Sequence, residues 1–253
     1  MKSFNIAGPC NPARHYMIDA ATRLKGVEQL IDMEEYFVIH AARQSGKTTY
    51  LNELVGHLNA KGQYYALCCS FKGLQEIIDP IDGIPAIVRT IQNKLGDSDI
   101  PHKEEFAKDA KFDHYIGVLG LAFTRFCRLL DKPLVVLFDD VDCLSRDTTA
   151  AFLSELRVGY NTRVRVPFIH SAALVGIHDV SRFRGPVSPG NTSPAVPVPF
   201  NIVTETFTLK NFTQKEIAQL YQQHTDETGQ QFEPDAVALV HEQTQGQPWL
   251  VNA

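Results

Sequence analysis

Short apolar runs alternate with segments of helical periodicity as far as residue 209, and this pattern predicts the fold class. Strands are predicted at the apolar runs near positions 37–39, 63–71, 133–139, 166–177 and 206–209. Apolar side chains at helical spacing predict helices over 20–31, 51–58, 84–95, 112–130 and 148–160. Pro85 is expected in the first turn of its helix, where a missing N–H costs no hydrogen bond. Strands that alternate with helices favour a parallel sheet with helices on both faces.

The C-terminal part of the chain departs from this alternation and contains helices only. Thr213 and Glu216 form a capping-box pattern at the start of one helix. A second helix is expected to begin near Pro234 and to stop at Gly246, and the stretch 181–200, rich in proline and glycine, is predicted as a loop.

These patterns suggest two domains. Residues 1–209 are expected to form the α/β domain, with 1–35 as its N-terminal segment and first helix. Residues 210–253 are expected to form part of a helical lid.

The first predicted strand runs into a phosphate-binding pattern, Ala41-x-x-x-x-Gly46-Lys47-Thr48, in which alanine replaces the usual first glycine. Gly46 lacks a Cβ and lets backbone N–H groups close around phosphate oxygens, while Lys47 supplies a charge and Thr48 a hydroxyl for Mg²⁺. The following helix adds the positive end of its dipole. The residues predicted to contact the nucleotide here are Ala41, Arg43, Gln44, Ser45, Gly46, Lys47, Thr48 and Thr49.

The apolar run 133–139 ends in Asp139 and Asp140, about ninety residues after the phosphate-binding pattern. A continuous apolar run suits a parallel strand covered on both faces, and ligands bind at the carboxyl edge of such sheets. Asp139 fits the acid that holds Mg²⁺, and Asp140 is placed to orient or deprotonate the attacking water. The alternative for this segment alone is a solvated strand end with acidic caps for the next helix.

Composition and charge narrow the function further. The chain has 253 residues, 44% of them hydrophobic, and a formal net charge of −5, so no global basic field attracts it to DNA or an anionic membrane. No apolar run approaches the roughly 20 residues needed to span a bilayer, and no signal-peptide core is present at the start. The five cysteines form no Cys-x-x-Cys pair, and a reduced, cytoplasmic protein is expected.

The chain resembles P-loop ATPases of the AAA+ and signal-transduction (STAND) type, and most of all bacterial AAA-like ATPases. The resemblance rests on Gly8-Pro9-Cys10-Asn11-Pro12, His15-Tyr16-Met17, the loop at 40–49, Asp139-Asp140 and Gly246-Gln247-Pro248-Trp249. It implies a three-layer α/β/α fold with a five-stranded parallel sheet in the order 5-1-4-3-2. It also implies ATP rather than GTP as the nucleotide, with Mg²⁺ as cofactor.

The resemblance implies further roles, each with a simpler alternative. His178 would be a nucleotide sensor or a surface histidine, and Arg182 and Arg184 would be a sensor and an arginine finger or solvated loop residues. Pro248 would pack on adenine, although a helix stop with glycine and then proline explains the segment locally. Tyr16 would line the base from the N-terminal side.

The resemblance implies an ATP-binding module that hydrolyses ATP slowly and switches the lid, but two features depart from the family. Asp140 replaces the more common glutamate and is one methylene shorter, and Ala253 lies where another lid helix is expected to begin. The main alternative is a scaffold that binds nucleotide without turnover. A small-molecule kinase and a DNA-remodelling ATPase are disfavoured, and autonomous nucleic-acid binding is not expected. Self-association or a protein effector is left open.

Overall fold

The computed structural model describes residues 1–18, 23, 26–108, 110, 114–177 and 202–253. By its internal contacts the chain forms two compact units. One unit consists of residues 1–25, 41–54 and 208–253, and the other consists of residues 26–40 and 55–207. The two-domain boundary at residue 209 stays a prediction.

A five-stranded sheet forms the centre of the α/β fold. Its strands are β1 (Tyr36–Ala41), β2 (Tyr65–Ser70), β3 (Leu134–Asp139), β4 (Ser171–Gly176) and β5 (Val203–Leu209). The order is β2-β3-β4-β1-β5, which confirms the predicted order, and β2, β3, β4 and β1 pair in parallel. Every residue of β3 and β4 is buried, as expected for strands covered on both faces.

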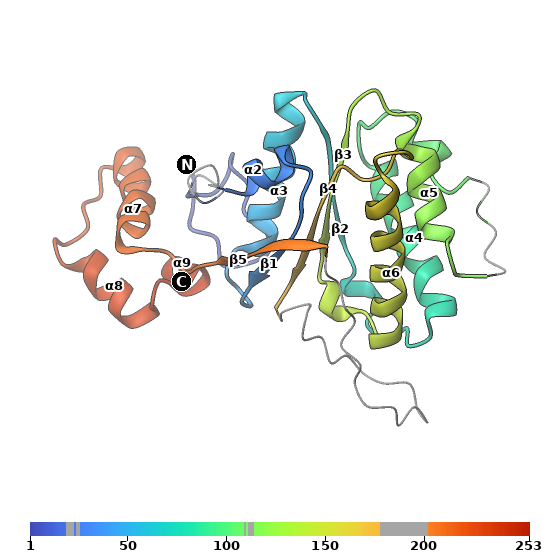
Figure 1. Ribbon diagram of the computed structural model, residues 1–253. Helices are drawn as coiled ribbons and strands as arrows, with labels where there is room; N and C mark the ends of the chain where they lie inside the picture. Colours follow the sequence, from blue (N-terminus) through green and yellow to red (C-terminus); the bar gives the residue numbers. More distant parts are fainter. Residues whose placement is uncertain (19–22, 24–25, 109, 111–113, 178–201) are drawn as a thin grey trace. The chain divides into compact units, whose positions relative to one another are not determined.

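Helices cover both faces of this sheet (Figure 1). On one face lie α4 (Pro80–Gly96), α5 (Val118–Cys127) and α6 (Arg146–Thr162), which pack against one another. On the other lie α2 (Val27–Asp32) and the C-terminal part of α3 (Lys47–Lys61). The described residues also form the short 3₁₀ turns η1 (Lys72–Leu74), η2 (Lys103–Glu105) and η3 (Val141–Cys143). The three-layer α/β/α architecture is therefore confirmed.

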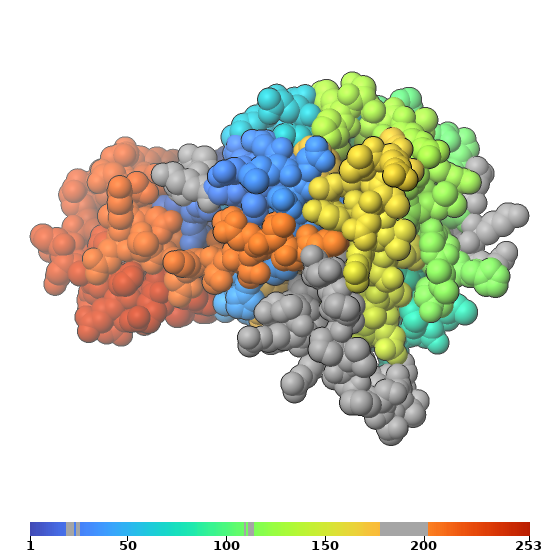
Figure 2. All heavy atoms as spheres, viewed as in Figure 1, coloured from blue at the N-terminus to red at the C-terminus, as the bar shows by residue number. Residues whose placement is uncertain are grey.

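Aromatic side chains fill the space between the sheet and the α4–α6 layer. Phe138 of β3 contacts Phe71, Phe152 and Phe123, with ring centroids 5.0 to 6.3 Å apart. All four rings are fully buried. The outer side of α6 lies at the surface of the molecule (Figure 2, yellow). Val158 of this helix is 62% exposed.

Two predicted helix starts are wrong, and each has a local cause. α4 begins at Pro80 rather than near Ile84, because the Asp79 side chain accepts a hydrogen bond from the N–H of Ile81 (2.9 Å). Pro85 therefore lies inside the helix and not in its first turn. α5 begins at Val118 rather than near residue 112, because Gly117 has a left-handed backbone (φ 82°) that interrupts helical geometry.

The remaining helices are α7 (Gln214–Thr228), α8 (Ala236–Thr244) and α9 (Pro248–Asn252). The predicted capping box is confirmed, since the Thr213 hydroxyl accepts from the N–H of Glu216 and the Glu216 carboxylate accepts from the N–H of Thr213. The core of this unit joins the N-terminal segment to α7 and α9 through Tyr16, Ile18, Ile217, Leu220, Tyr221 and Val251. Among the described residues, no helix is long and apolar enough to cross a membrane.

Gly246 ends the α8 segment in a place that no other residue fits. Its φ is 70°, and an added Cβ would collide with the carbonyl oxygen of Phe212. The two backbones are also joined, because the N–H of Phe212 donates to the carbonyl of Gly246 (2.7 Å).

We expect Gly246→Ala to destabilise the protein more than Gly229→Ala does. Gly229 also has a positive φ (76°) but has open space around its Cβ position, so it isolates the cost of the backbone conformation. That cost is about 1–2 kcal/mol, and the collision at Gly246 adds about 1–3 kcal/mol. Denaturant unfolding of the two variants measures the difference, and equal losses would contradict the steric explanation.

Candidate functional site

The phosphate-loop pattern lies between the end of β1 at Ala41 and the start of α3 at Lys47. Two of its residues have a left-handed backbone, Gln44 with φ 59° and Gly46 with φ 80°. Left-handed residues that alternate with ordinary ones turn successive N–H groups toward one side and form an anion-binding concavity. No atom lies within 4 Å of the position that a Cβ on Gly46 would occupy, so this side of the loop is open.

Ser45 and Lys47 provide the fit test for a phosphate ligand. Ser45 is 1% exposed, and its buried hydroxyl has no hydrogen-bond partner among the described residues. Lys47 is half-buried at the first position of a 15-residue helix, where backbone N–H groups lack partners within the helix. Arg43 and Thr48 are exposed beside them. An unpaired hydroxyl, an ammonium group and a helix N-terminus together suit an anion with several oxygens.

Thr49 connects the loop to the N-terminal segment. Its hydroxyl accepts a hydrogen bond from the N–H of Cys10 (2.9 Å). The segment therefore lies against the first turn of α3, next to the residues predicted to bind phosphate. This contact was not anticipated, because nothing in the local pattern around Cys10 indicates it.

The segment Gly246–Trp249 approaches the loop from the C-terminal side. Gln247 caps α9 by accepting a hydrogen bond from the N–H of Leu250 (3.2 Å), and its Nε2 donates to Oε1 of Gln44 (3.5 Å). Pro248 is buried at the first position of α9. The structure thus brings this segment to the phosphate loop within one compact unit, while adenine contact by Pro248 stays a prediction.

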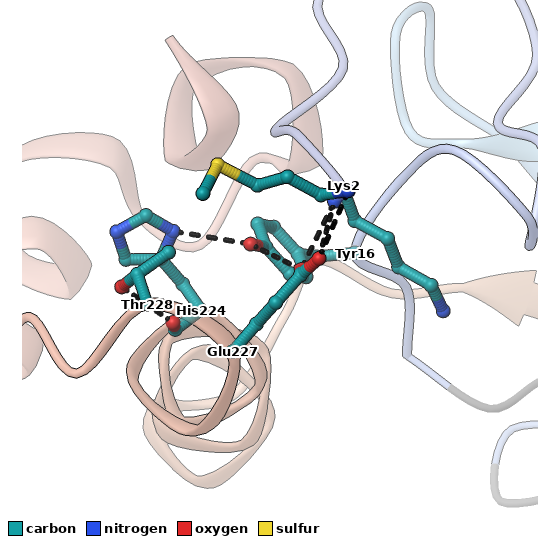
Figure 3. A network of polar contacts seen from close by, with 6 residues as sticks. Lys2, Tyr16, His224, Glu227 and Thr228 are labelled. Atoms are coloured by element: carbon teal, nitrogen blue, oxygen red, sulfur yellow. Dashed lines mark hydrogen bonds and ion pairs between the residues drawn. The ribbon is translucent and has the colours of Figure 1, made fainter.

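Tyr16 lies in a cluster of polar and aromatic groups rather than at an open surface (Figure 3). Its ring is 2% exposed and packs edge-on to His224, with centroids 5.5 Å apart. Its hydroxyl donates to the Glu227 carboxylate (2.8 Å), which also accepts from the N–H of Lys2 (2.9 and 3.0 Å). Tyr16 therefore fixes the N-terminal segment to α7, and its predicted contact with the base stays untested.

In the other unit, Asp139 is the last residue of β3 and Asp140 follows it. Asp139 is 2% exposed, and its carboxylate accepts from the N–H of Asp140 (2.8 Å). Asp140 has a left-handed backbone (φ 56°), a conformation that aspartate tolerates better than most residues. Its carboxylate accepts from the hydroxyl of Ser70 (2.8 Å), which lies opposite Asp139 in the β2–β3 register.

Ser70 and Asp142 were missed in the sequence. The Asp142 carboxylate accepts from the N–H of Ile177 (3.0 Å) and so ties η3 to the end of β4. A serine at the end of a strand does not indicate a functional role until the strand beside it is known. Asp142 could have been noticed, because it lies two residues after Asp140. His178, Arg182 and Arg184 lie outside the described residues.

Metal-binding groups in the described part of the chain are sparse. No cluster of three or more His, Cys, Asp or Glu side chains that could hold a metal ion occurs there. A protein cage is therefore not available in these residues, whereas Mg²⁺ characteristically uses one or two protein ligands together with phosphate oxygens and water. Thr48 is exposed and Asp139 is buried, and their predicted roles as Mg²⁺ ligands stay predictions.

No protein-family model matches the sequence, and no curated protein matches it either. Solved structures do match the fold. The chain is similar to the Walker-type ATPase of Pyrococcus abyssi (13% identity, TM-score 0.62), with 98% of this chain and 69% of that chain covered. It is also similar to Cdc6p from Pyrobaculum aerophilum (12% identity, TM-score 0.59), with 95% and 61% covered.

A third similar structure is the Orc1 protein of Aeropyrum pernix in complex with DNA (12% identity, TM-score 0.54), with 92% of this chain and 58% of that chain covered. The chain thus spans 58 to 69% of the length of these three proteins. Together with the sheet order, these similarities show that the chain has the α/β fold of P-loop NTPases.

The Glu227 network makes a pH-dependent contribution to stability. Hydrogen bonds from the N–H of Lys2 and from the Tyr16 hydroxyl lower the pKa of Glu227. Because the folded-state pKa is depressed, this stability is present above the unfolded pKa of about 4.3 and is lost as pH falls through the folded pKa.

We expect Glu227→Gln to flatten the acid limb of the stability profile. Its melting temperature should lie below that of the wild type near neutral pH, and the difference should shrink as the pH falls below about 4. Glu242→Gln, which changes an exposed residue of α8, is the matched control. A difference that stays constant across the acid range would contradict the assignment.

Proposed function

We propose that the chain binds Mg·ATP at the phosphate loop and hydrolyses it slowly, as the ATP-binding module of an AAA+ or STAND-like ATPase. The observation that carries this proposal is the loop at residues 42–46. It combines an open left-handed Gly46, the buried and unpartnered hydroxyl of Ser45, and Lys47 at the start of α3. The AAA+ fold of the similar structures supports the same conclusion.

Each group near the loop has a distinct role in phosphate binding. Backbone N–H groups around Gly46 donate to phosphate oxygens, and Lys47 neutralises the charge of the outer phosphates. Ser45 donates its hydroxyl, which gives this buried group a partner. Arg43, Gln44 and Thr49 complete the contacts, and Ala41 holds the end of β1 beneath the loop.

Thr48 and Asp139 are the residues that would hold Mg²⁺. Bound Mg²⁺ neutralises charge on the β- and γ-phosphate oxygens. The burial of Asp139 at the end of β3 and the hydrogen bond from Asp140 fix this carboxylate in one orientation.

Asp140 is the proposed base for the attacking water. The hydrogen bond from Ser70 holds its carboxylate in place, so no conformational search precedes the proton transfer. The side chain is one methylene shorter than the glutamate common in the family, which favours slow turnover. His178, Arg182 and Arg184 are proposed as sensor and arginine-finger residues that complete charge stabilisation.

The proposal also covers the nucleobase and the helical lid. Adenine is favoured because of the family resemblance, with Tyr16 and Pro248 as base contacts, and no Asn-Lys-x-Asp guanine reader occurs in the sequence. The nucleotide state is proposed to change the position of the helical lid, and a protein effector or a second copy would read that change in the cytoplasm. No nucleic-acid partner is proposed for a chain of net charge −5.

A second candidate function is a scaffold that holds nucleotide without turnover, and Asp140 in place of glutamate favours it. A phosphate-release assay over a range of protein concentrations separates the two functions. Turnover that rises with protein concentration would additionally indicate arginines supplied by a second copy.

Lys47→Ala is expected to weaken Mg·ATP binding about 100-fold or more, because the outer phosphates lose their cation. Isothermal titration calorimetry measures the affinity. The matched control is Lys61→Ala at the other end of the same helix, where the ammonium pairs with Glu28 instead. Undiminished binding by Lys47→Ala would rule out the proposed phosphate site.

Asp140→Asn is expected to retain Mg·ATP binding but to reduce kcat by about 100- to 10,000-fold, because an amide cannot accept the proton of the attacking water. Asp131→Asn is the control, since Asp131 precedes β3 and accepts from the Tyr65 hydroxyl (2.8 Å). Steady-state phosphate release reports kcat. Equal rates for Asp140→Asn and the wild type would exclude Asp140 as the base.

A further inference from the structure

Three hydrogen bonds connect the phosphate loop, the N-terminal segment and α9 in a closed path, which we call the hydrogen-bonded circuit. The N–H of Cys10 donates to the hydroxyl of Thr49 (2.9 Å), at the start of α3. The indole N–H of Trp249 donates to the carbonyl of Ile6 (2.8 Å). The amide of Gln247 donates to the amide oxygen of Gln44 (3.5 Å), back in the loop.

All members of the circuit belong to one compact unit, so the three contacts depend on one local arrangement. The backbone connects Ile6 to Cys10, Gln44 to Thr49 and Gln247 to Trp249, and no connection is longer than five residues. Each of the three segments is therefore held by two of the three bonds. Residues farther out keep α9 in place, since Gly246 is joined to Phe212 and the Tyr221 hydroxyl donates to the carbonyl of Val251 (3.1 Å).

The weakest bond of the circuit lies where a nucleotide would act. At 3.5 Å the Gln44–Gln247 contact is near the limit of hydrogen bonding, whereas the other two bonds have normal lengths. Gln44 also belongs to the loop that would close around phosphate. Gln44 has a left-handed backbone, an unfavourable conformation for a non-glycine residue that persists only when the surrounding loop residues enforce it.

We propose that Gln44 and Gln247 are positioning residues that couple phosphate binding at the loop to α9 and to the N-terminal segment. When phosphate enters, the loop adjusts to donate its N–H groups, and the side chain of Gln44 moves with it. The side chain of Gln247 then moves as well, because its amide nitrogen bonds to Gln44 of the loop while its amide oxygen accepts from the N–H of Leu250 in α9. The adjustment reaches Trp249 two residues later and alters its bond to Ile6. This inference rests on the proposed nucleotide binding.

The sequence provides its own reporter, because Trp249 is the only tryptophan of the chain. Its indole is 37% exposed and hydrogen-bonded, and both properties determine tryptophan emission. The experiment titrates Mg·ATP into the purified full chain and records tryptophan fluorescence and calorimetric heat in parallel. In the wild type the emission should change and should saturate at the calorimetric midpoint.

The decisive variant is Gln44→Asn. Asparagine keeps an amide and accepts a left-handed backbone well, but it is one methylene shorter and cannot reach Gln247. The fluorescence change should be lost, while the affinity for Mg·ATP changes by about two- to tenfold, the range of one neutral hydrogen bond. Gln222→Asn on α7, whose amide pairs with Asp226 outside the circuit, is the matched control and should retain the change.

The outcomes separate this inference from the proposed function. Calorimetric binding without a fluorescence change in the wild type would overturn the coupling and leave nucleotide binding intact. A full fluorescence change in Gln44→Asn would also overturn it. Absence of calorimetric binding in the wild type would overturn the proposed function, and the coupling with it.

Discussion

Backbone hydrogen bonds hold β1, β4 and β3 in parallel register, with His40 opposite Gly176 and Phe138 opposite Leu174. Parallel strands all end at the same edge of a sheet, so this pairing determines where the chemical segments leave the fold. The loop after β1 and the acids at the end of β3 are about ninety residues apart in sequence. Only β4 lies between β1 and β3 in the sheet, so these two parallel strands end at the same edge.

The Asp139 carboxylate lies at the end of the buried strand β3, in apolar surroundings, and needs a hydrogen-bond donor there. Phe138 lies among fully buried aromatic rings, and Asp139 follows it with 2% of its surface exposed. A buried carboxylate is costly without a hydrogen-bond donor, and the N–H of Asp140 is that donor. The left-handed backbone of Asp140 turns the chain immediately after the strand and leaves its own side chain within reach of Ser70.

The sequence predicted the parts of this fold that depend on local chemistry. The buried β3 follows from a continuous apolar run, and the capping box at Thr213 follows from side chains that cap their own helix. The strand order was implied by the resemblance to AAA+ and STAND ATPases and not by the residue pattern. The start of α5 was predicted wrongly because of the left-handed backbone of Gly117, and a second element adds to that helix end, since the Glu155 carboxylate of α6 accepts from the N–H of Gly120 (2.8 Å). The contacts of Tyr16 were not predictable either, because its partners are far away in sequence. Its ring pairs with α7, more than two hundred residues away.

The two chemical segments are held by different forces. The acids are fixed by a fully buried strand and aromatic packing, which resist displacement because any shift opens a cavity. The phosphate loop is held by single hydrogen bonds from segments at both ends of the chain, and each such bond contributes only about 0.5–1.5 kcal/mol. A ligand that offers several charge-assisted hydrogen bonds can outweigh those contacts.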